Sequence, residues 1–174
     1  MVTSFPLIMD GAMGTELMDR GLKMPLPLWS ADTNITDPEI VKAVHIDYVN
    51  AGADIIGTNT FRTTTWTYRK VGFSHKVSQS RARSSLMKAV DLARESNPKI
   101  LGASLTSIED CYDPSLYPGR SIAEDTYGEN IDWFIDAGVD VILFETMGHL
   151  EEIEIALETV KGLDHKIWLS LIMK

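Results

Sequence analysis

The sequence predicts an α/β fold of the (β/α)8 TIM-barrel type, incomplete in this chain, which supplies about five of the barrel strands. Three observations predict it. Short apolar runs alternate with longer segments of helical period, one βα unit recurs along the chain, and no dinucleotide-binding glycine motif follows a strand. Strands that alternate with helices form a parallel sheet with right-handed crossovers.

Short apolar runs bounded by turn-forming residues predict strands that are buried on both faces. The runs are Leu7–Met9, Asp54–Gly57, Ile100–Ser104, Val139–Phe144 and Ile167–Met173. The clearest helix between them starts after Asp37, where a capping side chain precedes a proline, and it carries Ile40, Val44 and Tyr48 on one face. Further helices are predicted over residues 82–93, 131–137 and 150–160.

The recurring unit spans residues 51–56 (AGADII) and residues 137–142 (AGVDVI). Each copy contains a helix end, a glycine, an acidic residue and the start of a strand. Either an open doubly wound sheet or a barrel fits this repeat, and the absence of a dinucleotide fingerprint favours the barrel. Because a complete barrel needs about 250 residues, residues 1–174 are interpreted as a single domain that forms the N-terminal portion of one.

Composition and charge narrow the classes of partner. The formal net charge is −9, and Lys and Arg form no stripe, so we expect no nucleic-acid partner. No apolar run approaches the roughly 18 residues that span a bilayer, and Met1–Asp10 lacks the features of a signal peptide. We therefore expect no membrane partner and a cytoplasmic location. The single cysteine, Cys111, excludes an internal disulfide framework and a zinc site built mainly from cysteines of this chain.

Polar residues follow the predicted strands where functional loops of a barrel lie. Asp10 ends the first run, Thr58, Asn59 and Thr60 follow the second, and Glu145 follows the fourth. We expect these residues to line one opening of the barrel. We also expect the first and fourth strands to lie side by side, so that the carboxylates of Asp10 and Glu145 bind one small zwitterion. The alternative is that Asp10 and Glu145 are helix caps, because anions are favourable at helix N-termini.

The first loop offers two more candidates. Gly11 and Gly14 can take positive φ and allow close approach of the backbone, so the amides around Gly11 could receive an anion while Asp10 accepts from an ammonium group. A tight turn that needs glycine for steric reasons explains them equally well. Trp29 either forms the floor of a binding pocket or packs within its loop.

Several motifs in order resemble the homocysteine S-methyltransferase family. They are residues 10–17 (DGAMGTEL), 28–31 (LWSA), 38–45, 48–61, 109–112 and 138–147. The resemblance implies methyl transfer from a charged methyl donor to a zinc-bound homocysteine thiolate, which yields methionine. It also implies that Asp10 and Glu145 hold the substrate ammonium and that amides around Gly11 receive its carboxylate. Thr58, Asn59, Thr60 and Trp29 complete the expected binding site for homocysteine.

Two departures from the family affect the expected chemistry. The zinc ligands of the family are cysteines from later in the barrel, and Cys111 matches none of them, so we expect no metal ligand, no catalytic residue and no activity from this chain alone. Arg62 stands where betaine-using members carry an aromatic residue, which disfavours a quaternary ammonium donor and leaves a sulfonium or methylfolate donor open. Two alternatives are a non-catalytic half-barrel that binds an amino acid or partner, or self-associates as a homo-oligomer, and, ranked last, a glycoside hydrolase that uses Asp10 and Glu145.

Overall fold

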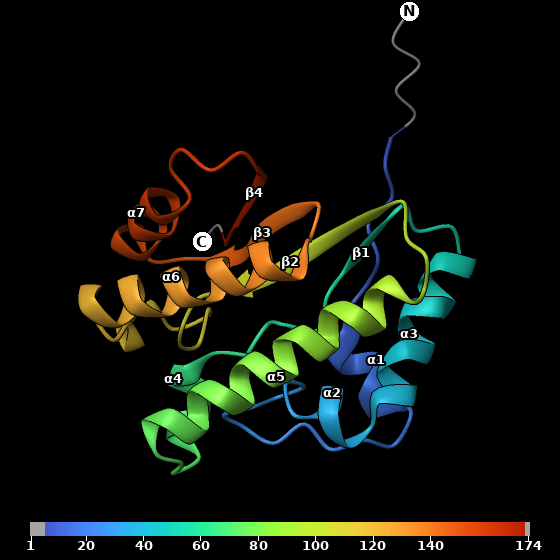
Figure 1. Ribbon diagram of the computed structural model, residues 1–174, viewed down its shortest axis with the longest axis horizontal. Coiled ribbons are helices and arrows are strands. Elements are labelled where there is room, and N and C mark those ends of the chain that lie inside the picture. The colour runs from blue at the N-terminus through green and yellow to red at the C-terminus, as the bar shows by residue number, and fades with distance from the viewer. Residues whose placement is uncertain (1–5, 173–174) are drawn as a thin grey trace, which may run out of the picture.

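The computed structural model describes residues 6–172, and its centre is a parallel sheet with helices packed against it (Figure 1). The strands are β1 (Ile55–Gly57), β2 (Ile100–Thr106), β3 (Val141–Met147) and β4 (Lys166–Leu171). Within the described residues, each strand pairs in parallel with the next strand in sequence, in the order β1-β2-β3-β4. A doubly wound sheet reverses its strand order part-way, so this sequential order indicates a barrel.

The first predicted strand is reduced to a single bridge. Met9 pairs with Ile55 in parallel, and the amide of Asp10 donates to the carbonyl of Ile55 over 3.0 Å. The next ladder bond is missing because the amide of Gly57 donates to the side chain of Asp10 instead of to a backbone carbonyl. The segment therefore lies beside β1 in a strand position without forming a regular strand. At the other end of the chain, Met173 of the fifth predicted strand lies outside the described residues.

The predicted helices are present, and two of them begin earlier than the sequence pattern indicates. The long helices are α3 (Pro38–Asn50), α5 (His75–Arg94), α6 (Arg120–Ala137) and α7 (Leu150–Thr159). The first turns of α6 bury Ala123 and Thr126, which are too small or too polar to give an apolar period. Short helices occupy the loops: α1 (Met13–Asp19), α2 (Thr33–Thr36), α4 (Thr65–Lys70) and the 3-10 turn η1 (Pro114–Leu116).

The largest hydrophobic core lies between the sheet and helices α5, α6 and α7. Leu86 of α5 and Phe134 of α6 are fully buried against residues of β2 and β3 such as Leu105 and Phe144. Burial of each such side chain contributes about 1.5–3 kcal/mol. This packing holds β2 and β3 in register, with Thr106 opposite Glu145, so their carboxyl ends lie at one edge of the sheet.

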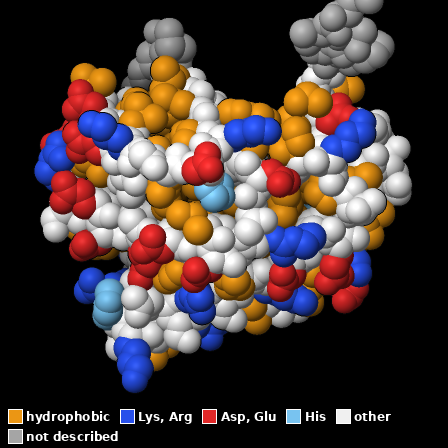
Figure 2. Space-filling view, turned by 45° about the horizontal axis from the view of Figure 1, so that its top comes forward, with side chains coloured by type: hydrophobic (Ala, Val, Ile, Leu, Met, Phe, Trp, Pro, Cys, Tyr) orange, Lys and Arg blue, Asp and Glu red, His pale blue; other side chains and the backbone are white. Residues whose placement is uncertain are grey.

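The surface carries charges of both signs. Figure 2 shows basic and acidic side chains interspersed on one face, with hydrophobic side chains between them. Strands β1 and β4 form the two edges of the described sheet. Exposed hydrophobic residues lie at both edges: Leu7 and Ile8 beside β1, and Leu169 and Leu171 on β4. No helix within residues 6–172 has both the length and the apolar character needed to cross a membrane.

Candidate functional site

A cavity of about 440 Å³ opens at the carboxyl ends of the first strands. All of the predicted site residues except Thr60 line it: Asp10, Gly11, Trp29, Thr58, Asn59 and Glu145. Further apolar lining comes from side chains that include Met9, Met13 and Phe61. The cavity therefore combines two carboxyl groups with an apolar wall, and no Lys or Arg of the described chain lines it.

The carboxyl group of Asp10, which lines this cavity, is hydrogen-bonded to the backbone of β1. The amide of Gly57 donates to Asp10 Oδ2 over 2.9 Å. A Cβ atom at position 57 would lie 3.4 Å from Asp10 Oδ1, so glycine allows the carboxyl group to sit close to the strand. Burial raises the pKa of Asp10 to about 7, the hydrogen bond from Gly57 opposes the rise, and the charge of Glu145 adds to it.

Glu145 reaches the same cavity from an irregular part of β3. The pairing of β3 with β4 shifts register between Phe144 and Met147, and Thr146 has a positive φ of 54°, which is uncommon for a β-branched residue. The Thr146 side chain shares a hydrogen bond of 2.8 Å with the hydroxyl of Thr106 on β2. Burial raises the pKa of Glu145, and the nearby Ser104 hydroxyl opposes the rise. A bulge beside a cavity is a common way to re-aim a side chain.

The arrangement of the two carboxyl groups corrects one expectation and removes an alternative. The segment of Asp10 and strand β3 are not side by side, because β1 and β2 lie between them. The groups face each other across the cavity instead, close enough for the charge of Glu145 to affect Asp10. Neither is a helix cap, since Ala12 is the N-cap of α1 and His149 is the N-cap of α7.

Gly11 and Gly14 are required for close packing rather than for a left-handed backbone. Neither has a positive φ. A Cβ atom at position 11 would lie 2.7 Å from the hydroxyl of Tyr48, and one at position 14 would lie 2.5 Å from Trp29 Nε1. Among the described residues, the amide of Gly11 has no acceptor within hydrogen-bond distance. Gly11 therefore combines an unpaired amide, among the described residues, with a position in the cavity lining.

Asn59 connects the cavity to the loop that carries Trp29. Its Oδ1 accepts from the Ser30 hydroxyl over 2.6 Å, and its Nδ2 donates to the Ser30 carbonyl over 3.0 Å. Asn59 Nδ2 also donates to Oδ1 of Asn34 over 2.9 Å. Asn34 cannot be recognised from the sequence, because a single buried amide in a polar loop has no pattern of its own.

Thr60 serves the sheet rather than the cavity. Its hydroxyl donates to the carbonyl of Ser104 over 2.6 Å and shares a hydrogen bond of 2.7 Å with the hydroxyl of Thr58. It is fully buried. Thr60 thus ties the end of β1 to β2, while Thr58 and Asn59 face the cavity.

Arg62 and Cys111, the residues that bear on the methyl donor and on a metal, both lie outside the cavity lining. Arg62 donates to the carbonyl of Ile108 over 3.2 Å and is not among the residues that line the cavity, but its guanidinium carbon lies 5.8 Å from the ring of Phe61, which does line it. Cys111 is buried in a separate loop. No group of three or more His, Cys, Asp or Glu side chains suited to a metal ion occurs within residues 6–172, so the described residues do not fit the metal of the family.

Comparison with known proteins gives the family. A sequence model described as homocysteine S-methyltransferase matches residues 7–174. The chain belongs to the homocysteine S-methyltransferase family. Homocysteine S-methyltransferase 2 of Zea mays is 30% identical over 94% of the chain, and the homocysteine S-methyltransferase of Escherichia coli K12 is 28% identical over 97%. The chain spans 55% and 59% of the length of these two relatives.

Solved structures support the fold. The homocysteine methyltransferase MmuM of Escherichia coli in its oxidized form has a TM-score of 0.81 and 26% identity, and the match covers 94% of the chain and 61% of MmuM. The metallated form has a TM-score of 0.87 over 99% of the chain and 65% of MmuM, at 24% identity. The prediction of an α/β fold of the TIM-barrel type, present in part, is confirmed.

Proposed function

We propose that the cavity binds the amino-acid end of homocysteine and that the chain is the substrate-binding part of a homocysteine S-methyltransferase. The observation that carries the proposal is a pair of partly buried carboxyl groups, Asp10 and Glu145, that line one cavity with no Lys or Arg of the described residues. An anion that is partly removed from water is stabilised by a counter-charge. The ammonium group of an amino acid supplies one.

Each end of the substrate has a partner in the cavity. The ammonium group would lie between Asp10 and Glu145, where a unit charge about 4 Å from a carboxylate gains on the order of 4 kcal/mol at an effective dielectric constant of 20. The substrate carboxylate would accept from the free amide of Gly11. Met13, Trp29 and Phe61 line the cavity and offer apolar surface to the side chain of the substrate and to the methyl donor.

The proposed reaction moves a methyl group from a charged donor to the thiol of homocysteine and gives methionine. In the complete enzyme, we propose zinc as the metal that keeps the thiol deprotonated. Residues other than those of the described chain would have to hold it, because residues 6–172 contain no suitable cluster. The role of this chain is thus to bind and orient the amino acid, with Asp10 and Glu145 deciding which amine-bearing ligands enter.

Isothermal titration calorimetry with L-homocysteine tests the proposal. The matched ligand is 4-mercaptobutanoate, which keeps the thiol and carboxylate and lacks the ammonium group. We expect Asp10→Asn to weaken L-homocysteine binding about tenfold or more, since a hydrogen bond to a charged group is worth about 1.5–3 kcal/mol. Asp164→Asn, at an exposed position, should leave binding unchanged. Equal affinity for both ligands, or an unchanged affinity in Asp10→Asn, would contradict the proposal.

A further inference from the structure

We propose that Asn34 and Ser85 are positioning residues that set the cavity wall formed by Trp29 and Ser30, and thereby the affinity for the amino acid. Neither residue lines the cavity. They act through Asn59, whose side chain is shared between the cavity wall and the interior of the protein. The identity of the ligand rests on the proposed function, whereas the control of the wall rests on the hydrogen bonds alone.

Asn34 is the centre of a buried amide network. Its side chain is fully buried in α2. Its Nδ2 donates to the carbonyl of Asn59 over 2.9 Å and to the Ser85 hydroxyl over 3.0 Å, and it also lies 3.1 Å from the carbonyl of Ala31. Its Oδ1 accepts from Asn59 Nδ2. A buried network of this kind fixes a unique arrangement, because any lost partner leaves a polar group unsatisfied.

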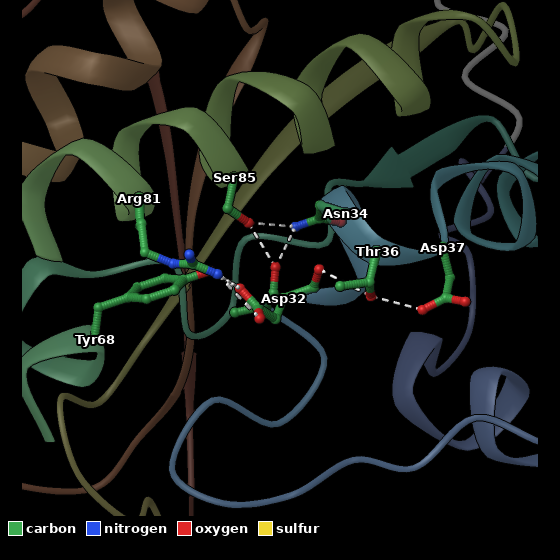
Figure 3. Close-up of polar contacts among 8 residues, drawn as sticks. Asp32, Asn34, Thr36, Asp37, Tyr68, Arg81 and Ser85 are labelled. Carbon is green, nitrogen blue, oxygen red and sulfur yellow. Dashed lines mark hydrogen bonds and ion pairs between the residues drawn. The ribbon is translucent and has the colours of Figure 1, made fainter. Parts of the chain in front are cut away.

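Ser85 anchors this network to the core. It lies on α5, in the turn beside the fully buried Leu86, and its hydroxyl donates to the carbonyl of Ala31 over 2.5 Å. Figure 3 shows Ser85 and Asn34 pointing toward each other between α5 and α2. The loop that follows Trp29 is therefore tied to a rigid helix through two buried side chains.

A second anchor of the same loop lies at the surface. Tyr68 donates to Asp32 Oδ1 over 3.0 Å, and Arg81 Nη2 lies 3.4 Å from both oxygens of Asp32. Figure 3 shows the side chains of Tyr68 and Arg81 directed toward Asp32. The ion pair is partly exposed, so water and salt screen it. The side chains of the amide network are buried, so water and salt do not screen them in this way.

The conformation of Trp29 depends on these anchors. Trp29 has a positive φ of 51°, a left-handed conformation that costs energy in a residue with a Cβ atom and persists only where surrounding contacts hold it. Its indole packs on the backbone of Gly14, and the adjacent Ser30 is bonded to Asn59 through both its hydroxyl and its carbonyl. Loss of the network therefore releases the strained residue, and the wall of the cavity moves.

The test measures the wall and the ligand separately. The indole signal of Trp29 in a ¹⁵N–¹H correlation spectrum is assigned by its loss in Trp29→Phe. We expect Asn34→Asp and Ser85→Ala each to shift or broaden this signal, while the indole signals of Trp133 and Trp168 stay in place. The dissociation constant for L-homocysteine should rise about tenfold in both variants, which corresponds to about one lost hydrogen bond in a buried network.

Asn130→Asp is the matched control. Asn130 is a fully buried asparagine on α6 that donates to the carbonyl of Thr63 over 3.2 Å and is not part of the network. It should lower stability without moving the Trp29 signal or the affinity. The proposal is overturned if folded Ser85→Ala and Asn34→Asp lose stability but keep the Trp29 signal and the affinity of the wild type, or if Asn130→Asp changes both. Absence of L-homocysteine binding in the wild type would end the proposed function only, because the Trp29 signal still decides the positioning role.

Discussion

Among the residues that line the cavity, Asp10 has a strongly shifted pKa. Burial and the neighbouring Glu145 raise its pKa from 3.8 to about 7, although the amide of Gly57 donates to it. The amide favours the charged form and burial disfavours it, and burial is the larger effect. A cationic ligand between the two carboxyl groups would reverse this balance. In the free protein, burial therefore destabilises the ionised form of Asp10, and we expect a bound cationic ligand to stabilise that form.

This shift predicts how stability depends on pH. Because the folded pKa of Asp10 lies above its unfolded value, the folded state binds the proton more tightly between pH 4 and pH 7, and the free energy of unfolding falls as the pH rises through that window. The shift from 3.8 to about 7 corresponds to at most about 4 kcal/mol. Urea denaturation of Asp10→Asn at pH 5 and pH 8 should show a smaller difference than the wild type. Asp164→Asn should keep the slope of the wild type, and an unchanged slope in Asp10→Asn would contradict the assignment.

Binding should respond to pH in the opposite sense. Ionised Asp10 is the form that attracts an ammonium group, so the affinity for L-homocysteine should increase as the pH rises through about 7. Calorimetry in two buffers of different ionisation enthalpy should reveal the proton that Asp10 releases when the ligand binds. In Asp10→Asn the difference between the buffers should shrink. A wild-type enthalpy that is independent of the buffer would show that Asp10 does not change its charge on binding.

At the scale of elements, α1 depends on the absence of a side chain at position 14. A Cβ atom there would lie 2.5 Å from Trp29 Nε1, so Gly14→Ala must displace Trp29 or the start of α1. Alanine is preferred over glycine in a helix by about 1 kcal/mol, and overpacking costs about 1–3 kcal/mol. We expect a net loss of stability together with weaker ligand binding. Gly128→Ala on α6, where a Cβ atom meets nothing within 4 Å, should stabilise instead by about 0.5–1 kcal/mol. Both can be read from urea denaturation midpoints, and stabilisation by both variants would rule out the clash.

The elements also show what a sequence pattern can and cannot reveal. Strands β2 and β3 were predicted because each is a short apolar run that is largely buried on both faces, and helix α3 was predicted because it carries apolar residues on one face. The repeated Ala-Gly-x-Asp unit indicated a recurring βα unit, which fitted either an open doubly wound sheet or a barrel. The bulge at Thr146 was not predictable, since it arises from the register between two strands that are far apart in sequence. The same holds for Asn34, whose importance comes from partners on other elements.

For the site, the polar residues at the strand ends were predictable from topology, and their exact partners were not. The carboxyl ends of parallel strands meet at one edge, so the sequence predicts that Asp10 and Glu145 line a common cavity. Thr60 carries the same kind of side chain as Thr58, and only the backbone decides that its hydroxyl bonds to Ser104 rather than facing the cavity.

At the scale of the whole molecule, the two edges of the described sheet carry exposed apolar side chains. On β4, Leu169 and Leu171 are 37% and 50% exposed, and beside β1, Leu7 and Ile8 are 55% and 58% exposed. An exposed apolar strand at a sheet edge pairs readily with another strand. We therefore expect the chain to associate with itself at micromolar concentrations, which sedimentation velocity would detect as a sedimentation coefficient that rises with concentration.

Charge on the edge should oppose this association. Leu171→Lys places an ammonium group on β4, where it prevents close pairing without filling the core, and it should shift the population toward the monomer. Leu150→Lys is the matched control, because Leu150 is 72% exposed and belongs to helix α7, not to a strand of the sheet. An equal shift in both variants would mean that general surface hydrophobicity, and not the edge of β4, drives the association. A wild-type chain that sediments as a monomer at all concentrations would mean that the exposed edge does not template pairing, and would remove the half-barrel oligomer as an alternative.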